Sequence, residues 1–233
     1  MPTRLIHLSS VRAPALGRLG SGAILRRSTL VPLRPGYERA KRALDLAVCL
    51  LLLPTALVVM ALCALAVALC DGRPIFFFQE RTGRGGRPFR MYKFRTMVVN
   101  ALELKAALAA RNHLTGPDFK IADDPRVTRL GALLRKTSLD EVPQILNVLR
   151  GEMSLVGPRP TSFAASTYDL WHTERLEVPP GITGLWQVSG RSDIDFDDRV
   201  RLDIEYLERR SFAFDLVILF RTVAALVQQR GAY

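Results

Sequence analysis

The sequence predicts a mainly helical α/β fold. A re-entrant, membrane-embedded helical hairpin is expected to carry a small cytosolic domain with a β-hairpin and interfacial amphipathic helices. Residues 46–70 form a run of 25 residues without a charge, and residues 75–97 place strand-forming segments around a glycine-rich turn. Much of the remaining chain has helical apolar spacing. The 233 residues suffice for one domain with a core plus an appendage.

The composition limits the class of protein. Hydrophobic residues make up 48% and charged residues 24%, which excludes disorder along the whole chain. Three cysteines are too few for a disulfide scaffold, and with three histidines no zinc site is expected. The net charge of +11 indicates a polyanionic partner. Nucleic acid, anionic lipid and phosphorylated substrates are therefore the candidates.

Residues 1–37 are predicted to form a separate basic arm. This stretch contains six arginines and no acidic residue, and it lacks an apolar core long enough for a signal peptide. We expect a disordered arm. A role in binding the membrane surface or a partner is the alternative.

Residues 38–70 are assigned to the membrane. A bilayer needs about 20 apolar residues, so a simple transmembrane helix is the plainest interpretation of residues 46–70. However, Pro54 cannot donate to the Leu50 carbonyl and is expected to kink the helix. The pieces of 8 and 16 residues on its two sides are each too short to cross a hydrocarbon core of about 30 Å. Both flanks are basic, as expected for cytoplasmic ends, which favours a re-entrant hairpin.

The predicted cytosolic domain, residues 71–233, opens with a β-hairpin around Gly83–Gly86. Residues 81–97 include six basic side chains and no acid. They could form a solvated basic face near anionic lipid. Alternatively, Lys93 and Arg95 bind phosphate, because residues two apart on a strand share one face and a guanidinium can bind phosphate in bidentate fashion.

Adjacent carboxylates, Asp140 and Glu141, stand at the start of a predicted helix, which Gly151 is expected to end. They could simply cap it, since Ser138 and Glu141 have capping-box spacing and acids are favoured in a first turn. The surrounding charge favours a site, because Arg135 precedes the pair and Arg159 follows it. Carboxylates beside phosphate-binding cations suit magnesium-assisted phosphoryl chemistry, in which one oxygen attacks while another holds the metal.

Apolar spacing predicts further helices over 98–112, 126–136 and 195–210, with a loop over 115–124. A last, mostly apolar helix over 212–229 is either a core helix or an interfacial helix that seats the domain on the membrane.

Four stretches carry a family resemblance. They are KRALDLAVCLLLLP (41–54), DGRPIFFFQERTGRGGRPFRMYKFRTM (71–97), DPRVTRLGALLRKTSLDEVPQILNVLRGEMSLVGPRP (124–160) and the segment from PGITGLWQVSGR to the end (180–233). The succession KFRTM, SLDEVPQ and VGPRP resembles the bacterial sugar transferases, monotopic polyprenyl-phosphate phosphoglycosyl transferases, and within them the type that initiates exopolysaccharide synthesis. Leu53 stands before Pro54, where the family often has serine. Many large relatives carry transmembrane helices and an extra domain before this module, whereas a single-module form is expected here.

The resemblance implies transfer of a sugar-1-phosphate from a UDP-sugar to undecaprenyl phosphate, with release of UMP and with Mg²⁺ as cofactor. It implies that the protein binds membrane lipid at the cytoplasmic face of the bacterial inner membrane, and it is compatible with a homodimer. Asp140 matches the nucleophile that forms an aspartyl phosphosugar, and Glu141, beside it in the metal site, matches the metal ligand. The positions that match substrate-binding cations are Lys93, Arg95, Arg135 and Arg159.

Two rival functions stay open. A membrane-tethered nucleic-acid binder would explain the charge, but no RNA or DNA motif occurs. An inactive scaffold for polysaccharide assembly is disfavoured by the intact carboxylate pair. The sugar is not determined by the sequence, with galactose or glucose suggested by the resemblance.

Overall fold

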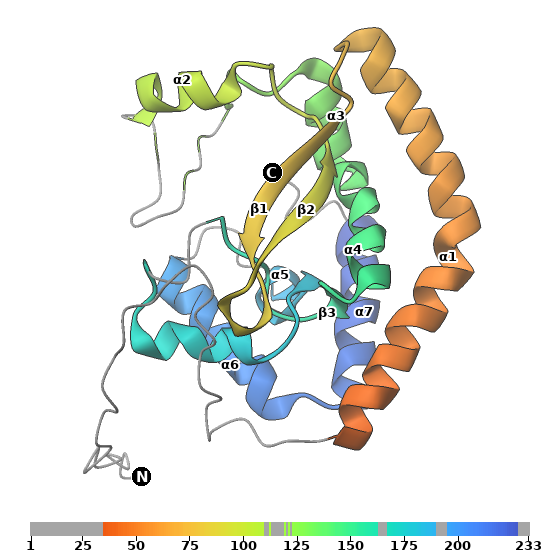
Figure 1. Ribbon diagram of the computed structural model, residues 1–233, viewed down its shortest axis with the longest axis vertical. Helices are drawn as coiled ribbons and strands as arrows, with labels where there is room; N and C mark the ends of the chain where they lie inside the picture. Colours follow the sequence, from red (N-terminus) through yellow and green to blue (C-terminus); the bar gives the residue numbers. More distant parts are fainter. Residues whose placement is uncertain are drawn as a thin grey trace.

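Figure 1 shows the computed structural model of the chain. The structure describes residues 35–109, 112, 119, 121, 123–162, 167–189 and 195–227. Residues 1–34 of the predicted arm and most of the predicted loop over 115–124 lie outside the described residues. Helices dominate the described residues, which also form two small two-stranded sheets, so the mainly helical α/β class is confirmed.

The longest element is α1, a helix of 36 residues from Pro35 to Cys70. It is long and apolar enough to cross a membrane, and among the described residues it is the one helix that meets this test. The helix continues through Pro54, so the expected hairpin of two separate pieces is not formed. Instead, α1 curves along one side of the body (Figure 1). A long helix can accommodate a proline by bending, since the ring displaces one preceding carbonyl and removes one donor.

The inner and outer faces of α1 differ in their surroundings. On the inner face, Cys49, Cys63 and Val67 are buried against the body. The outer face exposes large apolar side chains: Leu50, Leu51, Leu52, Leu57, Val58, Leu62, Leu65 and Leu69. A continuous apolar surface of this kind is typical of a face that contacts lipid or another protein rather than water.

The predicted β-hairpin is present. Strand β1 (Phe76–Thr82) pairs antiparallel with β2 (Pro88–Phe94), and Phe77 lies opposite Lys93. The turn uses Gly85 and Gly86 at φ of 65° and 75°, a conformation that glycine adopts without steric cost. In the view of Figure 1, α3 and α4 lie between this hairpin and α1, and α4 contacts both β2 and α1.

Two helices follow the hairpin. Helix α2 (Ala101–Ala107) is shorter than predicted, and α3 (Arg129–Lys136) begins later than predicted. The later start is due to Thr128, whose hydroxyl accepts a hydrogen bond of 2.9 Å from the Gly131 backbone N–H and so caps the helix. A Cβ on Gly131 would lie 2.1 Å from the Thr96 carbonyl oxygen, so glycine allows α3 to lie directly against the chain after β2.

The carboxylate pair lies in a 3₁₀ helix, Leu139–Gln144, which leads into α4 (Ile145–Arg150). Ser138 adopts a left-handed conformation with φ of 56°, and its side chain makes no capping hydrogen bond. The capping-box alternative is therefore not realised. Helix α4 ends at Gly151, at φ of 81°, as predicted.

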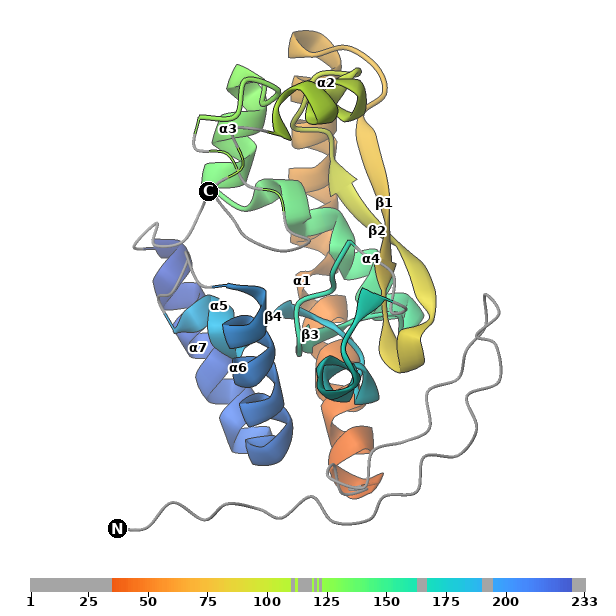
Figure 2. The same cartoon turned by 90° about the vertical axis from the view of Figure 1, so that its left-hand side faces the viewer.

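The C-terminal half adds a parallel strand pair that no local pattern predicts, β3 (Ser154–Val156) with β4 (Gly181–Thr183). A 3₁₀ helix, Leu170–Glu177, and the short helix α5 (Leu185–Val188) accompany the pair. The two predicted helices follow as α6 (Phe196–Arg209) and α7 (Phe212–Val227), both of which lie on the left in Figure 2.

Within the described part of the chain, the core consists of three apolar clusters. One lies between α6, α7 and β3, and the other two join α1 to the body. Buried members are, in that order, Leu207 and Ile218; Cys49 and Val148; and Val67 and Phe94. Helix α7 is thus a core helix on one face, through Ile218, while Phe220 and Val223 are exposed on its other side. Membrane contact by that outer side stays a prediction.

Candidate active site

Asn147 on α4 holds strand β2 in place. Its fully buried amide donates to the Arg90 carbonyl at 2.7 Å and accepts from the Tyr92 backbone N–H at 3.1 Å. A side chain that bonds both a carbonyl and an N–H of one strand fixes the position of that strand. Lys93 follows Tyr92 on β2, so its position beside the 3₁₀ helix that carries the carboxylates is fixed as well.

Asp140 and Glu141 both lie within reach of Lys93. Its Nζ is 2.6 Å from Glu141 Oε1 and 3.6 Å from Asp140 Oδ2. Asp140 is only 6% exposed, so the surroundings of its carboxylate are largely dry. A lysine shared between two adjacent carboxylates offsets the repulsion between them.

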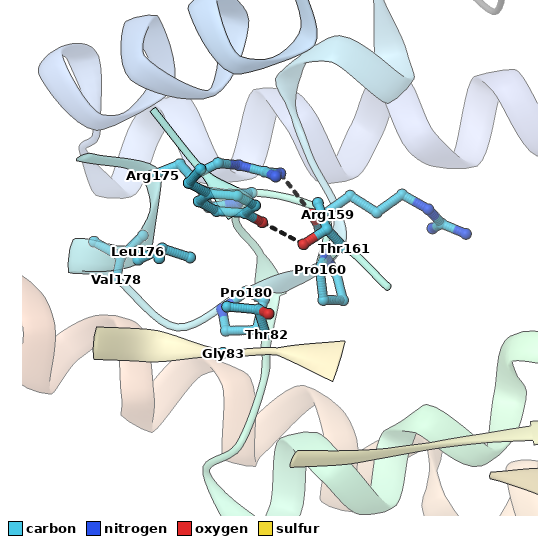
Figure 3. Close-up of a pocket in the computed structure, with 11 residues that line it drawn as sticks. Thr82, Gly83, Arg159, Pro160, Thr161, Arg175, Leu176, Val178 and Pro180 are labelled. Carbon is cyan, nitrogen blue, oxygen red and sulfur yellow. Dashed lines mark hydrogen bonds between the residues drawn. The ribbon is translucent and has the colours of Figure 1, made fainter. Parts of the chain in front are cut away.

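Arg159 lies in the loop after β3, and hydrogen bonds to its carbonyl groups hold the backbone of this loop in place. Four successive carbonyls, of residues 158 to 161, each accept a hydrogen bond. Their donors are, in order, the Gly181 N–H at 2.9 Å, the Arg175 guanidinium at 2.6 Å, the Arg81 guanidinium at 3.4 Å and the Thr82 N–H at 3.1 Å. Figure 3 shows the bond from Arg175 to Arg159. A backbone held in this way presets the direction of its side chains.

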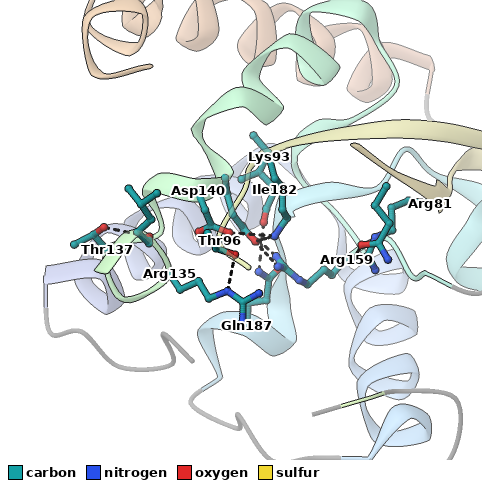
Figure 4. Close-up of polar contacts among 12 residues, drawn as sticks. Arg81, Lys93, Thr96, Arg135, Thr137, Asp140, Arg159, Ile182 and Gln187 are labelled. Atoms are coloured by element: carbon teal, nitrogen blue, oxygen red, sulfur yellow. Dashed lines mark hydrogen bonds and ion pairs between the residues drawn. The ribbon is translucent and has the colours of Figure 1, made fainter. Parts of the chain in front are cut away.

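The Arg159 side chain meets the carboxylates. Its Nη1 donates to Glu141 Oε2 at 3.3 Å, and its Nη2 donates to Glu141 Oε1. This is the paired arrangement that gives arginine–carboxylate contacts their strength and geometric specificity. Figure 4 shows Lys93, Asp140 and Arg159 meeting, with Arg135 beside them.

Arg135 approaches the cluster from the last turn of α3. Its Nε donates to the Thr96 hydroxyl at 2.9 Å, which leaves the two terminal nitrogens without a hydrogen bond among the described residues. Burial lowers the pKa of Arg135, although Asp140 nearby favours its charged form. A half-buried guanidinium with a free fork is a suitable group for binding an oxyanion.

The two carboxylates experience opposite electrostatic effects. Burial raises the pKa of Asp140, and Lys93 only partly offsets that effect. Burial also acts against ionisation of Glu141, but Arg159 and Lys93 together outweigh it and lower the pKa of Glu141 well below its usual range. Neighbouring acids whose environments push their pKa values apart are typical of sites in which the two have different roles.

Arg95 does not join the cluster. Its guanidinium is buried and donates to the Gly72 carbonyl at 2.9 Å, to the Arg73 carbonyl at 3.1 Å and to the Asp71 carbonyl. Strand β2 ends at Phe94, so the expected pairing of Lys93 with Arg95 on one strand face is not formed. Arg95 instead fastens the segment after α1, and the geometry gives no support to a substrate-binding role.

The donor set suits a magnesium ion that is shared with a substrate. Mg²⁺ in proteins is commonly bound by one or two carboxylates, with water and substrate phosphates at its other positions. Asp140 and Glu141 supply such a pair, and the described part of the chain contains no group of three or more potential metal ligands. Both Glu141 oxygens accept hydrogen bonds from cations, so a metal ion at Glu141 would compete with Lys93 and Arg159 for its charge.

Three residues that support the site were missed. Thr96, which orients Arg135, stands inside the KFRTM segment that drew attention to its neighbours. Asn147 was detectable, since it is a polar residue between Leu146 and Val148 on a predicted helix. Arg175 has no local signal, because its partners lie 16 and 28 positions away along the chain.

A family model described as bacterial sugar transferase matches residues 36–229. The chain belongs to the bacterial sugar transferase family. The match covers most of the chain, including every residue of the site, and it confirms the resemblance carried by the KFRTM, SLDEVPQ and VGPRP segments.

Several relatives of this bacterial sugar transferase are known. The galactosyl transferase CpsE of Streptococcus agalactiae is 49% identical over 164 residues, which is 70% of this chain and 36% of CpsE. The exopolysaccharide production protein ExoY of Sinorhizobium fredii is 41% identical over 210 residues, or 86% of this chain and 91% of ExoY. The UDP-glucose:undecaprenyl-phosphate glucose-1-phosphate transferase of Caulobacter vibrioides is 39% identical over 247 residues, which covers 97% of this chain and 88% of that protein. The chain therefore spans about a third of CpsE but most of the other two.

Proposed function

We propose that this bacterial sugar transferase moves a sugar-1-phosphate from a UDP-sugar to undecaprenyl phosphate and releases UMP. The observation that carries the proposal is the carboxylate pair, buried Asp140 beside partly buried Glu141, surrounded by Lys93, Arg135 and Arg159. The names of the Caulobacter vibrioides and Streptococcus agalactiae relatives support it and point to a UDP-hexose, glucose in one case and galactose in the other.

In the first step, a carboxylate oxygen of Asp140 attacks the β-phosphorus of the UDP-sugar. The bond from that phosphorus to the bridging oxygen breaks, UMP leaves with the bonding electrons, and an aspartyl phosphosugar is formed. Asp140 suits this role because it is largely shielded from water, and an ionised, poorly hydrated carboxylate is the better nucleophile. Lys93, at 3.6 Å, favours the ionised form.

In the second step, a phosphate oxygen of undecaprenyl phosphate attacks the same phosphorus. The Asp140 carboxylate leaves, and the product is the sugar linked to the lipid through a diphosphate. The two steps restore the enzyme without any net change in its protonation, because carboxylate and phosphate serve as both nucleophile and leaving group.

The cations hold the phosphates. Arg135 offers its free fork, while Lys93 and Arg159 are engaged by Glu141 before substrate binds. Substrate phosphates carry more charge than one carboxylate and would compete for these two cations. Cations placed where charge develops stabilise phosphoryl transfer, because they need not reorganise during the reaction.

We assign Mg²⁺ to Glu141 together with Asp140. When bound, the ion would neutralise diphosphate charge and polarise the oxygens around the reacting phosphorus. Release of Glu141 from one of its cations would make that residue available as a ligand and would free the cation for phosphate.

The same structure supports a monotopic arrangement on the cytoplasmic face of the inner membrane. Near the start of α1, Lys41 pairs with Asp215 of α7 at 3.0 Å. Just past the other end, the Thr128 hydroxyl donates to Asp71 Oδ2 at 2.8 Å. Both ends of α1 are thus bound to one folded body and would lie on one side of the membrane. Only the curved, apolar outer face of the helix would then enter the lipid.

Mass spectrometry tests the chemistry directly. The purified protein is incubated with UDP-galactose or UDP-glucose and Mg²⁺, but without a lipid acceptor. A hexose-phosphate adduct should map to Asp140, disappear in Asp140→Asn and persist in the control Asp198→Asn, whose side chain is half exposed on α6. Normal release of UMP by Asp140→Asn in the full reaction would show that the proposed mechanism is wrong.

A further inference from the structure

A buried ion pair, Arg175–Asp203, lies behind the site and takes no part in the chemistry described above. Arg175 is 4% exposed and Asp203 is 1% exposed. One nitrogen of the guanidinium, Nη2, is 2.6 Å from Asp203 Oδ2 and also 2.6 Å from the Arg159 carbonyl oxygen. The pair therefore ends on the backbone of a residue whose side chain reaches Glu141.

The pair connects three parts of the fold. Arg175 lies in the 3₁₀ helix Leu170–Glu177, Asp203 lies on α6, and Arg159 lies in the loop after β3. The guanidinium also lies over the Phe196 ring, 5.7 Å from its centre, which restricts its orientation. In Figure 3, Arg175 lies beside the loop and its dashed bond ends at Arg159, whose own guanidinium points away from Arg175.

Stability alone gives a poor account of this arrangement. Removing two charges from water is costly, and buried ion pairs often contribute little or nothing to net stability compared with apolar residues. Here burial raises the pKa of Asp203 to about 6 in spite of Arg175, so keeping Asp203 ionised at neutral pH costs the fold free energy. What the pair does achieve is to direct one strong donor at one carbonyl oxygen.

We propose that Arg175, held by Asp203, is a positioning residue for Arg159: it fixes the Arg159 peptide unit and so aims the guanidinium of Arg159 at the substrate phosphates. This inference rests on the phosphate-binding role proposed for Arg159. The other carbonyls of the loop are held by backbone N–H groups or by the longer bond of 3.4 Å from Arg81. The bond from Arg175 is made to Arg159 itself. Its loss would therefore change the direction of the Arg159 side chain more than loss of any of the other three bonds.

A double-mutant cycle tests the coupling between Arg175 and Arg159. We expect Arg175→Met to lower kcat/KM for UMP release by about 10- to 100-fold, since small misplacements of a catalytic group have effects of this size. In the background of Arg159→Ala, the same change should alter kcat/KM by less than about twofold, because the residue that Arg175 positions is already gone. Arg175→Lys, which can keep one charged donor near the carbonyl, should recover part of the activity.

The matched control is Arg210→Met. Arg210 is also a buried arginine, 2% exposed, and it pairs with Glu38 at 2.7 Å, away from the loop. Its loss should lower Tm, and its effect on kcat/KM should be the same in the presence and absence of the Arg159 side chain. Equal loss of kcat/KM from Arg175→Met in both backgrounds would overturn the proposal and leave Arg175 a structural residue.

The affinity for UDP with Mg²⁺, measured by calorimetry on the same proteins, separates this inference from the proposed function. An inactive wild-type protein would refute the proposed function, and the binding cycle would then decide the coupling by itself. The inference is supported if Arg175→Met weakens UDP binding in the wild-type background but has no further effect on it in the Arg159→Ala background. Additive losses of affinity refute it. Should Arg175→Met fail to fold, Arg175→Lys takes its place in both cycles.

Discussion

Replacement of Glu141 by glutamine should destabilise the fold, whereas replacement of its neighbour Asp140 by asparagine should not. Glu141 is the anion on which Lys93 and Arg159 both converge. Removing one partner from a buried ion pair costs about 3–5 kcal/mol, because the other charge is left uncompensated. The Arg159 side chain is 30% exposed and can turn toward water, so a smaller loss, about 2 kcal/mol, is expected. For a chain of this size, that corresponds to a fall in Tm of roughly 4–8 °C.

Asp140 should respond differently. Because burial raises its pKa, its ionised form costs the fold free energy once the pH exceeds the usual aspartate range. Asparagine removes that charge, so Tm at neutral pH should stay the same or rise. The pKa of Glu141 is lowered, so the stability it contributes is complete above its ordinary value of 4.5 and is lost as the pH falls below it. The difference in Tm between the two variants should therefore shrink on acidification.

Thermal unfolding of the detergent-solubilised protein, followed by tryptophan fluorescence at neutral and acidic pH, measures both effects. Glu205→Gln is the control, since Glu205 forms an exposed ion pair with Arg209 on α6 and should change stability by only tenths of a kcal/mol. Equal losses of Tm in Asp140→Asn and Glu141→Gln at neutral pH would refute the reasoning. Both variants should nevertheless lose activity, so that Asp140→Asn combines retained stability with lost function.

Further predictions concern the cations and the membrane helix. Arg135→Lys and Arg159→Lys should each lower kcat/KM at least about tenfold, or roughly 1.4 kcal/mol, because lysine lacks the fork; wild-type kinetics would make both arginines structural. Arg95→Met should lower the free energy of unfolding by about 2–4 kcal/mol through its unpaired carbonyls, and a raised KM for UDP-sugar in the folded variant would contradict its structural role. Arg39→Cys and Arg84→Cys, each in a cysteine-free background, should be equally shielded from an impermeant thiol reagent in intact cells. Labelling of only one of the two would show that α1 spans the membrane.

Local patterns in the sequence determined most of the elements. The uncharged run predicted α1, and the glycine-rich turn between strand-forming segments predicted the β1–β2 hairpin. Apolar spacing predicted α6 and α7, and Gly151 predicted the end of α4. These features depend on interactions between residues near one another in the chain, so the sequence alone suffices. The Asp140–Glu141 pair and its flanking arginines were identified from the same kind of local information, together with the family resemblance.

The tertiary structure decided which of the basic side chains meet the carboxylates. Lys93 and Arg159 reach Glu141 from 48 and 18 residues away, whereas Arg95, two positions from Lys93, is directed to backbone carbonyls. No local pattern distinguishes an arginine that binds a carboxylate, such as Arg159, from one that binds backbone carbonyls, such as Arg95, because a guanidinium fits both kinds of acceptor equally well. The same holds for Arg175 and Asn147, which act on distant backbone groups. Whether Pro54 breaks or bends α1 also depends on packing, since residues on both sides of the proline lie against one body. Burial and long-range hydrogen bonds exist only once the chain has folded, and they assign the role of each polar residue.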